Sequence, residues 1–172
     1  EGTKIQVKVC GLMGGHSGAE IDKNRANANK LMGRFLYGLK KKADYAVISL
    51  TGGQKDNAIT RECITEFLTD APEEVKAYAK ELQEQIREEY TGSDENITIE
   101  VKENGVETAQ VLHPTSQEKI VFYLQNVPFG IQKMSGTIKG LVESSSNIGI
   151  LRLDEDELFA SSSVRSSVDA AC

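Results

Sequence analysis

The sequence contains few residues of the kinds that bind metals or form disulfide networks. Its 172 residues include three cysteines and two histidines. Cys10, Cys63 and Cys172 are odd in number and far apart, which matches neither a disulfide framework nor a zinc-binding pattern. The His, Cys, Asp and Glu residues nowhere cluster at the spacing of metal ligands. We therefore expect no metal site in this chain, and we predict that Cys10 and Cys63 are small residues of the core.

An excess of positive charge and long apolar runs are lacking as well. The formal net charge of -6 argues against a surface that binds nucleic acid. The one basic run, residues 40–42, lies where a helix is expected to end and where cations stabilise the helix dipole. No stretch approaches the roughly 20 apolar residues of a membrane span, and no signal peptide precedes the first predicted strand. These absences predict a cytoplasmic protein that binds neither nucleic acid nor membrane.

Residue periodicity predicts a β-α-β-β-α-β unit in the first part of the chain. Alternating and buried-looking runs indicate strands, and apolar residues at helical spacing indicate helices. The predicted strands are 4–10, 45–50, 63–68 and 97–101, and the predicted helices are 25–41 and 70–90. We expect Asp70 to cap the second helix, with Glu73 completing a capping box. This order predicts an α+β, ferredoxin-like fold, an antiparallel sheet with both helices on one face.

A second, smaller set of elements follows. It comprises a helix at 115–125 and a hairpin of strands 141–153 and 158–168, joined by an acidic turn at 154–157. We therefore divide the chain into a ferredoxin-like unit, residues 1–112, and an added helix and hairpin, residues 113–172. Because the chain opens directly into a strand and stops without a cap, we expect residues 1–172 to be one domain excised from a longer protein.

The segment 11–18 carries the strongest chemical signal, since three glycines surround His16. Residues 15–19 nearly match the Gly-x-Ser-x-Gly element of serine hydrolases, but the fifth position fails and His113 would have to act as the base. The loop also lacks the lysine and hydroxyl that follow a phosphate-binding loop. The third hypothesis is that His16 reaches across a cleft and donates a hydrogen bond to a charge that develops on a substrate held by another domain.

Residues 11–18 and 27–31 closely resemble the lid domain of bacterial aminoacyl-histidine dipeptidases. These enzymes belong to the di-zinc metallopeptidase family that includes the carnosinases. The similarity covers nearly the whole chain except a divergent middle, and it continues through residues 52–62, 128–130, 134–135, 140–147 and 164–169. The resemblance implies that this chain is the lid and dimerisation domain of a zinc-dependent dipeptidase.

The resemblance also implies roles for three residues. His16 matches the lid histidine that stabilises the tetrahedral oxyanion, in its own subunit or in a neighbour. Asn57 matches an asparagine that holds polar groups of the substrate. Arg165 matches the arginine that binds the free carboxylate of the peptide, a contact suited to a guanidinium fork. Thr60 stands where many relatives have proline, and this departure predicts a looser turn.

The remaining partners lie outside the chain. The family places two zinc ions in a catalytic domain of the same polypeptide, and it implies a homodimer that hydrolyses Xaa-His or other short dipeptides. Residues 1–172 alone should be inactive.

Two alternatives stay open, a stand-alone ferredoxin-like module that binds a ligand or oligomerises, and a relative that has lost its metal ligands. Each residue taken singly also has a structural explanation: His16 as a loop histidine satisfied by backbone carbonyls, Asn57 as a turn residue that tolerates positive φ, and Arg165 as a surface partner of Asp169 or of the acidic turn.

Overall fold

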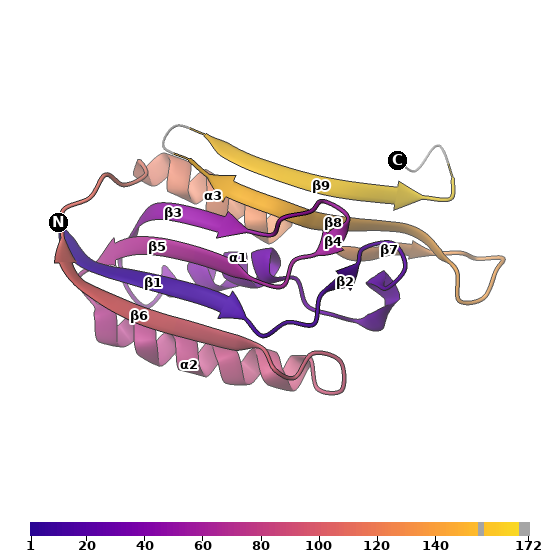
Figure 1. The fold of residues 1–172 in the computed structure, drawn as a ribbon, viewed down its shortest axis with the longest axis horizontal. Helices are drawn as coiled ribbons and strands as arrows, with labels where there is room; N and C mark the ends of the chain where they lie inside the picture. Colours follow the sequence, from indigo (N-terminus) through magenta and orange to yellow (C-terminus); the bar gives the residue numbers. More distant parts are fainter. Residues whose placement is uncertain (155–156, 169–172) are drawn as a thin grey trace.

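The protein, described here by a computed structural model, is ordered in two layers. The structure describes residues 1–154 and 157–168. Within these residues, seven strands form one antiparallel sheet and three α-helices lie against one of its faces (Figure 1). No helix in this part of the chain is both long and apolar enough to cross a membrane.

The first six elements of the two layers form a ferredoxin-like unit. In chain order they are β1 (Gly2–Cys10), α1 (Ala28–Leu39), β3 (Ala46–Gly52), β5 (Cys63–Thr69), α2 (Pro72–Glu89) and β6 (Thr98–Glu107). The strands lie in the order β6-β1-β5-β3, so β1 lies between β6 and β5. All three pairings are antiparallel. The predicted fold class is confirmed, although β6 extends six residues beyond the predicted strand end at 101.

The later elements extend this sheet. They are α3 (Pro114–Asn126), β7 (Gly130–Met134), β8 (Val142–Leu153) and β9 (Leu158–Ser166). Strand β8 pairs with β3 through residues 151–153 and with β7 through residues 142–146, whereas β9 runs along nearly the whole of β8. The predicted helix and hairpin are confirmed. The strand β7 was not predicted because most of its residues are exposed and it lacks an alternating pattern, and residues 155–156 of the acidic turn lie outside the described residues.

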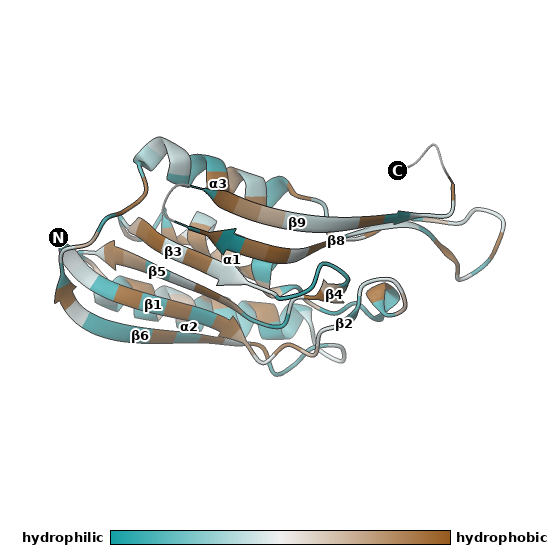
Figure 2. Ribbon diagram, turned by 45° about the horizontal axis from the view of Figure 1, so that its top comes forward, coloured by the Kyte–Doolittle hydropathy of each residue, from teal (hydrophilic) through white to brown (hydrophobic). Residues whose placement is uncertain are grey.

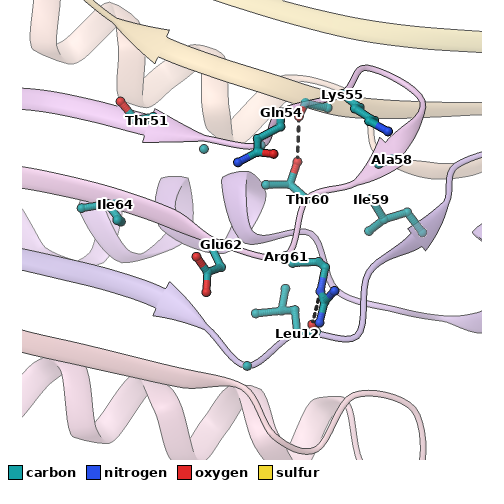
Figure 3. A pocket seen from close by; sticks show the side chains of 14 residues that line it. Leu12, Thr51, Gln54, Lys55, Ala58, Ile59, Thr60, Arg61, Glu62 and Ile64 are labelled. Atoms are coloured by element: carbon teal, nitrogen blue, oxygen red, sulfur yellow. Dashed lines mark hydrogen bonds between the residues drawn. The ribbon is translucent and has the colours of Figure 1, made fainter.

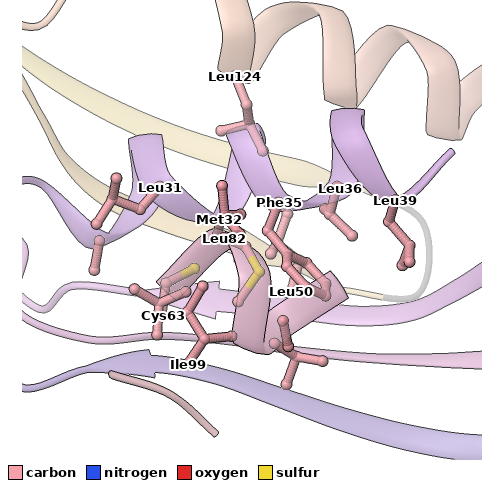
Figure 4. Close-up of a cluster of buried hydrophobic side chains, with 14 of the residues drawn as sticks. Leu31, Met32, Phe35, Leu36, Leu39, Leu50, Cys63, Leu82, Ile99 and Leu124 are labelled. Atoms are coloured by element: carbon pink, nitrogen blue, oxygen red, sulfur yellow. The ribbon is translucent and has the colours of Figure 1, made fainter. Parts of the chain in front are cut away.

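Helix α1 is the centre of the hydrophobic core. It lies between α2 and α3 and buries a continuous face against the sheet. Figure 4 shows its side chains meeting residues from the strands and from both other helices; the α1 residues are Leu31, Met32, Phe35, Leu36 and Leu39. Polar and apolar residues alternate along β1 (Figure 2), with Ile5, Val7 and Val9 buried. Each such side chain contributes about 1.5–3 kcal/mol to stability through burial, so the helices fix the inner face of the sheet.

The helix ends differ in part from the sequence prediction. Asn27 caps α1, because its side-chain oxygen accepts hydrogen bonds from the backbone N–H groups of Asn29 and Lys30, and the helix therefore begins at Ala28. It ends at Leu39, so the basic run follows the helix terminus as predicted.

The capping box predicted for α2 is wrong. Ala71 occupies the N-cap position and no side chain caps the helix there. The Thr69 hydroxyl instead accepts a hydrogen bond from the Ala71 N–H at 3.1 Å. Because Pro72 takes the first helical position, the N-cap shifts to Ala71 and Asp70 no longer faces the free amides.

Candidate functional site

The loop around His16 is attached to the turn that carries Asn57. Strand β2 (Gly15–His16) pairs antiparallel with β4 (Ala58–Ile59), and His16 lies opposite Ala58. The backbone N–H of Ser17 donates to the carbonyl of Asn57 at 3.0 Å. Residues that are far apart in the sequence are therefore neighbours in the structure.

Because position 15 is a glycine, the side chains of Glu20 and Arg25 can pack directly against the backbone of this loop. Gly15 has φ +137°, a left-handed conformation that favours glycine. A Cβ atom at Gly15 would lie 2.4 Å from Arg25 Nη1 and 2.7 Å from Glu20 Oε2. Any larger residue would push the Glu20–Arg25 pair away from the loop.

The imidazole of His16 has a defined hydrogen-bond pattern. Its Nδ1 accepts from the backbone N–H groups of Gly18 and Ala19, both at 3.1 Å, and the residue is exposed. A neutral imidazole carries its proton on one nitrogen, so an accepting Nδ1 leaves the proton on Nε2. The ring therefore presents an N–H donor at Nε2. The alternative of a ring bonded to backbone carbonyls is wrong, because the backbone partners of Nδ1 are donors.

The carboxylate of Glu20 holds the backbone of His16 in place. Its Oε2 accepts from the His16 N–H at 2.8 Å, and its Oε1 accepts from Arg25 Nη1 at 2.8 Å. Arg25 Nη1 also donates to the Gly14 carbonyl at 2.7 Å. The His16 hydrogen bond first, and then the Arg25 guanidinium, hold the pKa of Glu20 below its ordinary value. The loop is thus stabilised by a carboxylate that stays ionised.

Arg165, on β9, reaches the same loop. A Cβ atom placed on Gly18 would lie 3.0 Å from Arg165 Nε, 3.1 Å from Arg165 Cζ and 3.2 Å from His16 Cε1. The guanidinium of Arg165 and the imidazole of His16 therefore both border Gly18. Arg165 is exposed, so the fork of its guanidinium is open to a ligand.

The structure bears in part on the structural explanations of Arg165 and Asn57. Asp154 of the acidic turn accepts a hydrogen bond from Arg152, whereas Asp169 lies outside the described residues. Asn57 lies in a turn, as that alternative has it, but it does not adopt a positive φ, since Asn24 is the only residue other than glycine that does so among residues 1–154 and 157–168. The side chain of Asn57 is exposed. The structure thus brings together all three residues singled out in the sequence.

Ser17 and His113 do not form a nucleophile and its base. Ser17 is 1% exposed and its hydroxyl lies 3.4 Å from that of Ser163. His113 is the N-cap residue of α3, and its Nδ1 accepts from the Thr115 N–H at 3.3 Å. The serine hydrolase hypothesis therefore has no support in the geometry, and His113 has a structural role.

Thr60 tightens the turn rather than loosening it. It is 2% exposed, and its hydroxyl lies 3.1 Å from the carbonyl oxygens of both Ile148 and Gly149. The hydroxyl oxygen also accepts from Asn29 Nδ2 at 3.2 Å. The predicted looser turn is wrong, because this hydroxyl binds the turn to β8 and to α1.

A cavity of about 780 Å³ adjoins the β2–β4 ladder (Figure 3). Its charged lining residues are Lys55, Arg61 and Glu62. Arg61 Nε donates to the Leu12 carbonyl at 3.3 Å, and Glu62 forms an ion pair with Lys8 at 3.1 Å. The three residues predicted for the site do not line this cavity. Two of its charged residues therefore already have partners, in keeping with a structural role.

The described residues contain no candidate metal centre. In residues 1–154 and 157–168, no group of three or more His, Cys, Asp or Glu side chains is placed to hold an ion. Cys10 and Cys63 are buried, as predicted, and burial raises the pKa of both thiols. The described residues of this chain therefore do not fit a zinc site.

The fold and the site define a ferredoxin-like α+β domain with a histidine loop at one end of an extended sheet. Residues 7–94 match the family described as the peptidase dimerisation domain, and the chain belongs to this family. It is 30% identical over 168 residues to the cytosol non-specific dipeptidase of Escherichia coli (strain K12), a match that covers 96% of this chain and 34% of the relative.

A solved structure of a dipeptidase also matches this chain. The crystal structure of aminoacylhistidine dipeptidase from Vibrio alginolyticus superimposes with a TM-score of 0.93 at 29% sequence identity, covering 98% of this chain and 35% of that one. The chain thus spans about a third of the length of both relatives. The similarity to aminoacyl-histidine dipeptidases predicted from the sequence is confirmed.

The residues that support the site were missed in the sequence. Glu20 and Arg25 lie in a polar stretch and carry no motif. Asn147 is buried within β8, and an asparagine in the middle of a predicted strand is uncommon enough to have drawn attention.

Proposed function

We propose that this chain is the lid and dimerisation domain of a dipeptidase, and that His16, Asn57 and Arg165 act on a short peptide held by a catalytic domain of the same polypeptide. One observation carries the proposal. The His16 ring and the Arg165 guanidinium meet at Gly18, beside the turn that carries Asn57. A donor for an oxyanion and a fork for a carboxylate are thereby placed in one small region.

His16 would stabilise the tetrahedral transition state. The two backbone amides that bond Nδ1 keep the proton on Nε2, so the outward side of the ring is a hydrogen-bond donor. A preorganised donor of this kind is worth about 3–4 kcal/mol at a developing oxyanion. Because the donor is held by its own loop, this role needs no base or metal within this chain.

Arg165 and Asn57 would orient the substrate. The guanidinium suits a bidentate contact with the free carboxylate, and the exposed carboxamide of Asn57 can donate to or accept from a peptide group. One residue of extended peptide spans about 3.3–3.6 Å. Since the ring and the guanidinium lie against the same glycine, a carboxylate one residue beyond the scissile carbonyl fits, which favours dipeptides, including those of the Xaa-His type.

The metal and the second subunit complete the proposed enzyme. We place two zinc ions in the catalytic domain, where bound metal supplies Lewis-acid activation of the attacking water. The family's description as a dimerisation domain supports a homodimer, and the name of the Escherichia coli relative supports the cytoplasm as the compartment.

Replacing His16 in the complete polypeptide tests the proposal. We expect His16→Ala, which leaves no side-chain donor, to lower kcat for dipeptide hydrolysis by about 10²–10³, the usual effect of losing one oxyanion donor. The bound metal, measured by atomic absorption, should not change. The matched control is His113→Asn, which changes the other histidine of the chain while keeping a helix-capping residue, and kcat should stay within about twofold of wild type.

Two results would contradict the proposal. One is a His16→Ala enzyme with the kcat of the wild type. The other is a gene in which residues 1 and 172 are flanked directly by start and stop codons, because the catalytic domain would then be absent and the alternative of a stand-alone binding module would hold.

A further inference from the structure

A buried carboxamide lies directly beneath the turn that carries Asn57. Asn147, on β8, is 1% exposed. Its Nδ2 donates to the carbonyl oxygens of Asp56 at 3.0 Å and Ala58 at 2.9 Å. Its Oδ1 accepts from Asn27 Nδ2 at 3.1 Å, so the amide uses both its donors and its acceptor.

These two carbonyls belong to the residues on either side of Asn57. Ala58 is also the strand partner of His16, and the Asn57 carbonyl accepts from the Ser17 N–H. A single side chain therefore holds the backbone of the substrate-binding turn and, one strand further, the backbone of the histidine loop. Removing it would leave two carbonyls with fewer donors at the centre of the site.

The backbone of Asn147 lies beside the strand that carries Arg165. Asn147 lies opposite Ser163 in the β8–β9 ladder, and Arg165 lies two residues further along β9. The Ser163 hydroxyl donates to the Asp56 carbonyl at 3.1 Å. The turn also packs closely on β8, since a Cβ atom at Gly149 would lie 2.5 Å from the Asp56 Cα atom. The β8–β9 hairpin and the turn thus meet around this one asparagine.

We propose that Asn147 is a positioning residue, which sets His16 and Asn57 at their working distance from Arg165. It contacts neither substrate nor metal and acts through the backbone of Asp56 and Ala58. The inference rests on the proposed function for its effect on activity. Its effect on the geometry of His16 stands independently of that function.

The experiment compares Asn147→Ala with Thr65→Val in the complete polypeptide. Thr65 is also buried and polar, lies in the same sheet, and donates to the Ser49 carbonyl at 2.8 Å, away from the turn. We measure thermal unfolding, bound metal, kcat/KM for a dipeptide, and the ¹⁵N resonances of histidine-labelled protein, with His16 assigned by its loss in His16→Ala. Asn147→Ser, which keeps a small polar side chain, is a milder variant in case Asn147→Ala does not fold.

We expect Asn147→Ala to shift the His16 ring resonances and to lower kcat/KM at least tenfold more than Thr65→Val does, with bound metal unchanged. Asn147→Ser should shift the same resonances by less. The inference is overturned if Asn147→Ala, or Asn147→Ser where the former does not fold, leaves the His16 resonances at their wild-type positions. If the resonances move while His16→Ala is as active as wild type, the positioning role stands and the proposed function fails.

Discussion

Glu20 shows how a charged side chain in the loop sets the position of the His16 backbone. Its carboxylate accepts from the His16 backbone N–H and from Arg25, and both contacts favour the ionised form. Because the pKa of Glu20 is lowered in the folded state, the hydrogen bond to His16 is fully present above the ordinary glutamate pKa of about 4.3. It is lost as the pH falls through the lower pKa of the folded protein.

Arg25→Met should raise the pKa of Glu20 toward its ordinary value. The guanidinium is the second cause of the lowered pKa, and the bond from the His16 N–H remains, so the rise should be partial. The measurement is the ¹H–¹⁵N shift of the His16 amide between about pH 3 and pH 6. Lys23→Met, which removes an exposed cation from the same segment, is the control and should leave the midpoint unchanged. A midpoint in Arg25→Met equal to that of wild type would show that Arg25 does not act on Glu20.

At the scale of elements, one lysine joins α1 to the end of α3. Lys30 Nζ donates to the carbonyl oxygens of Leu124, Gln125 and Val127 at 2.7, 3.0 and 2.8 Å. The last carbonyls of a helix have no partner within the helix and carry the negative end of its dipole. Burial lowers the pKa of Lys30, and the three carbonyls replace the water that the ammonium loses.

Lys30→Met should lower the free energy of unfolding by about 1–3 kcal/mol, the usual contribution of hydrogen bonds from a charged group. Chemical denaturation measures it. Lys119→Met, at an exposed position on α3, is the matched control and should change stability by less than about 0.5 kcal/mol. Equal stabilities of the two variants would mean that water serves the α3 carbonyls as well as Lys30 does.

Element prediction succeeded where one face of an element is buried. The apolar stripe of α1 and the alternation of β1 follow from burial on one side, and both were found in the sequence. It failed where neighbours decide the outcome. The exposed β7 has no pattern of its own and is a strand because β8 lies beside it, and the start of α2 depends on the position of Pro72.

At the scale of the whole molecule, the candidate site is shared among three segments. His16 comes from the loop after β1, Asn57 from the turn after β3, and Arg165 from β9, and these regions lie toward the same end of the sheet (Figure 1). None of the described residues forms a metal-binding group. The described chain thus brings a histidine, an asparagine and an arginine toward one end of the sheet, and the source of the nucleophile is proposed to lie in the catalytic domain.

Residues 1–172 alone should therefore show no dipeptide hydrolysis, with or without added zinc. The complete polypeptide should be active under the same conditions. The measurement is release of free amino acids from a dipeptide by each protein at equal molar concentration. Zinc-dependent turnover by residues 1–172 would refute the separation of the substrate-orienting groups from the metal centre.

The sequence by itself determined the ferredoxin-like order of elements, the burial of Cys10 and Cys63, and the choice of His16, Asn57 and Arg165 as the residues to examine. The first two depend on local periodicity and composition, whereas the three residues were chosen by the glycine-rich motif around His16 and by the resemblance to a known family. Only the tertiary structure decided that Glu20 holds the His16 backbone, that the Thr60 hydroxyl ties its turn to β8, and that Asn147 lies beneath Asn57. The Thr60 and Asn147 contacts join residues far apart in the sequence that strand pairing brings together, whereas Glu20 and His16 are four residues apart and meet because the loop folds back on itself. No periodic pattern predicts these contacts, because the partners of a polar side chain are chosen by the fold.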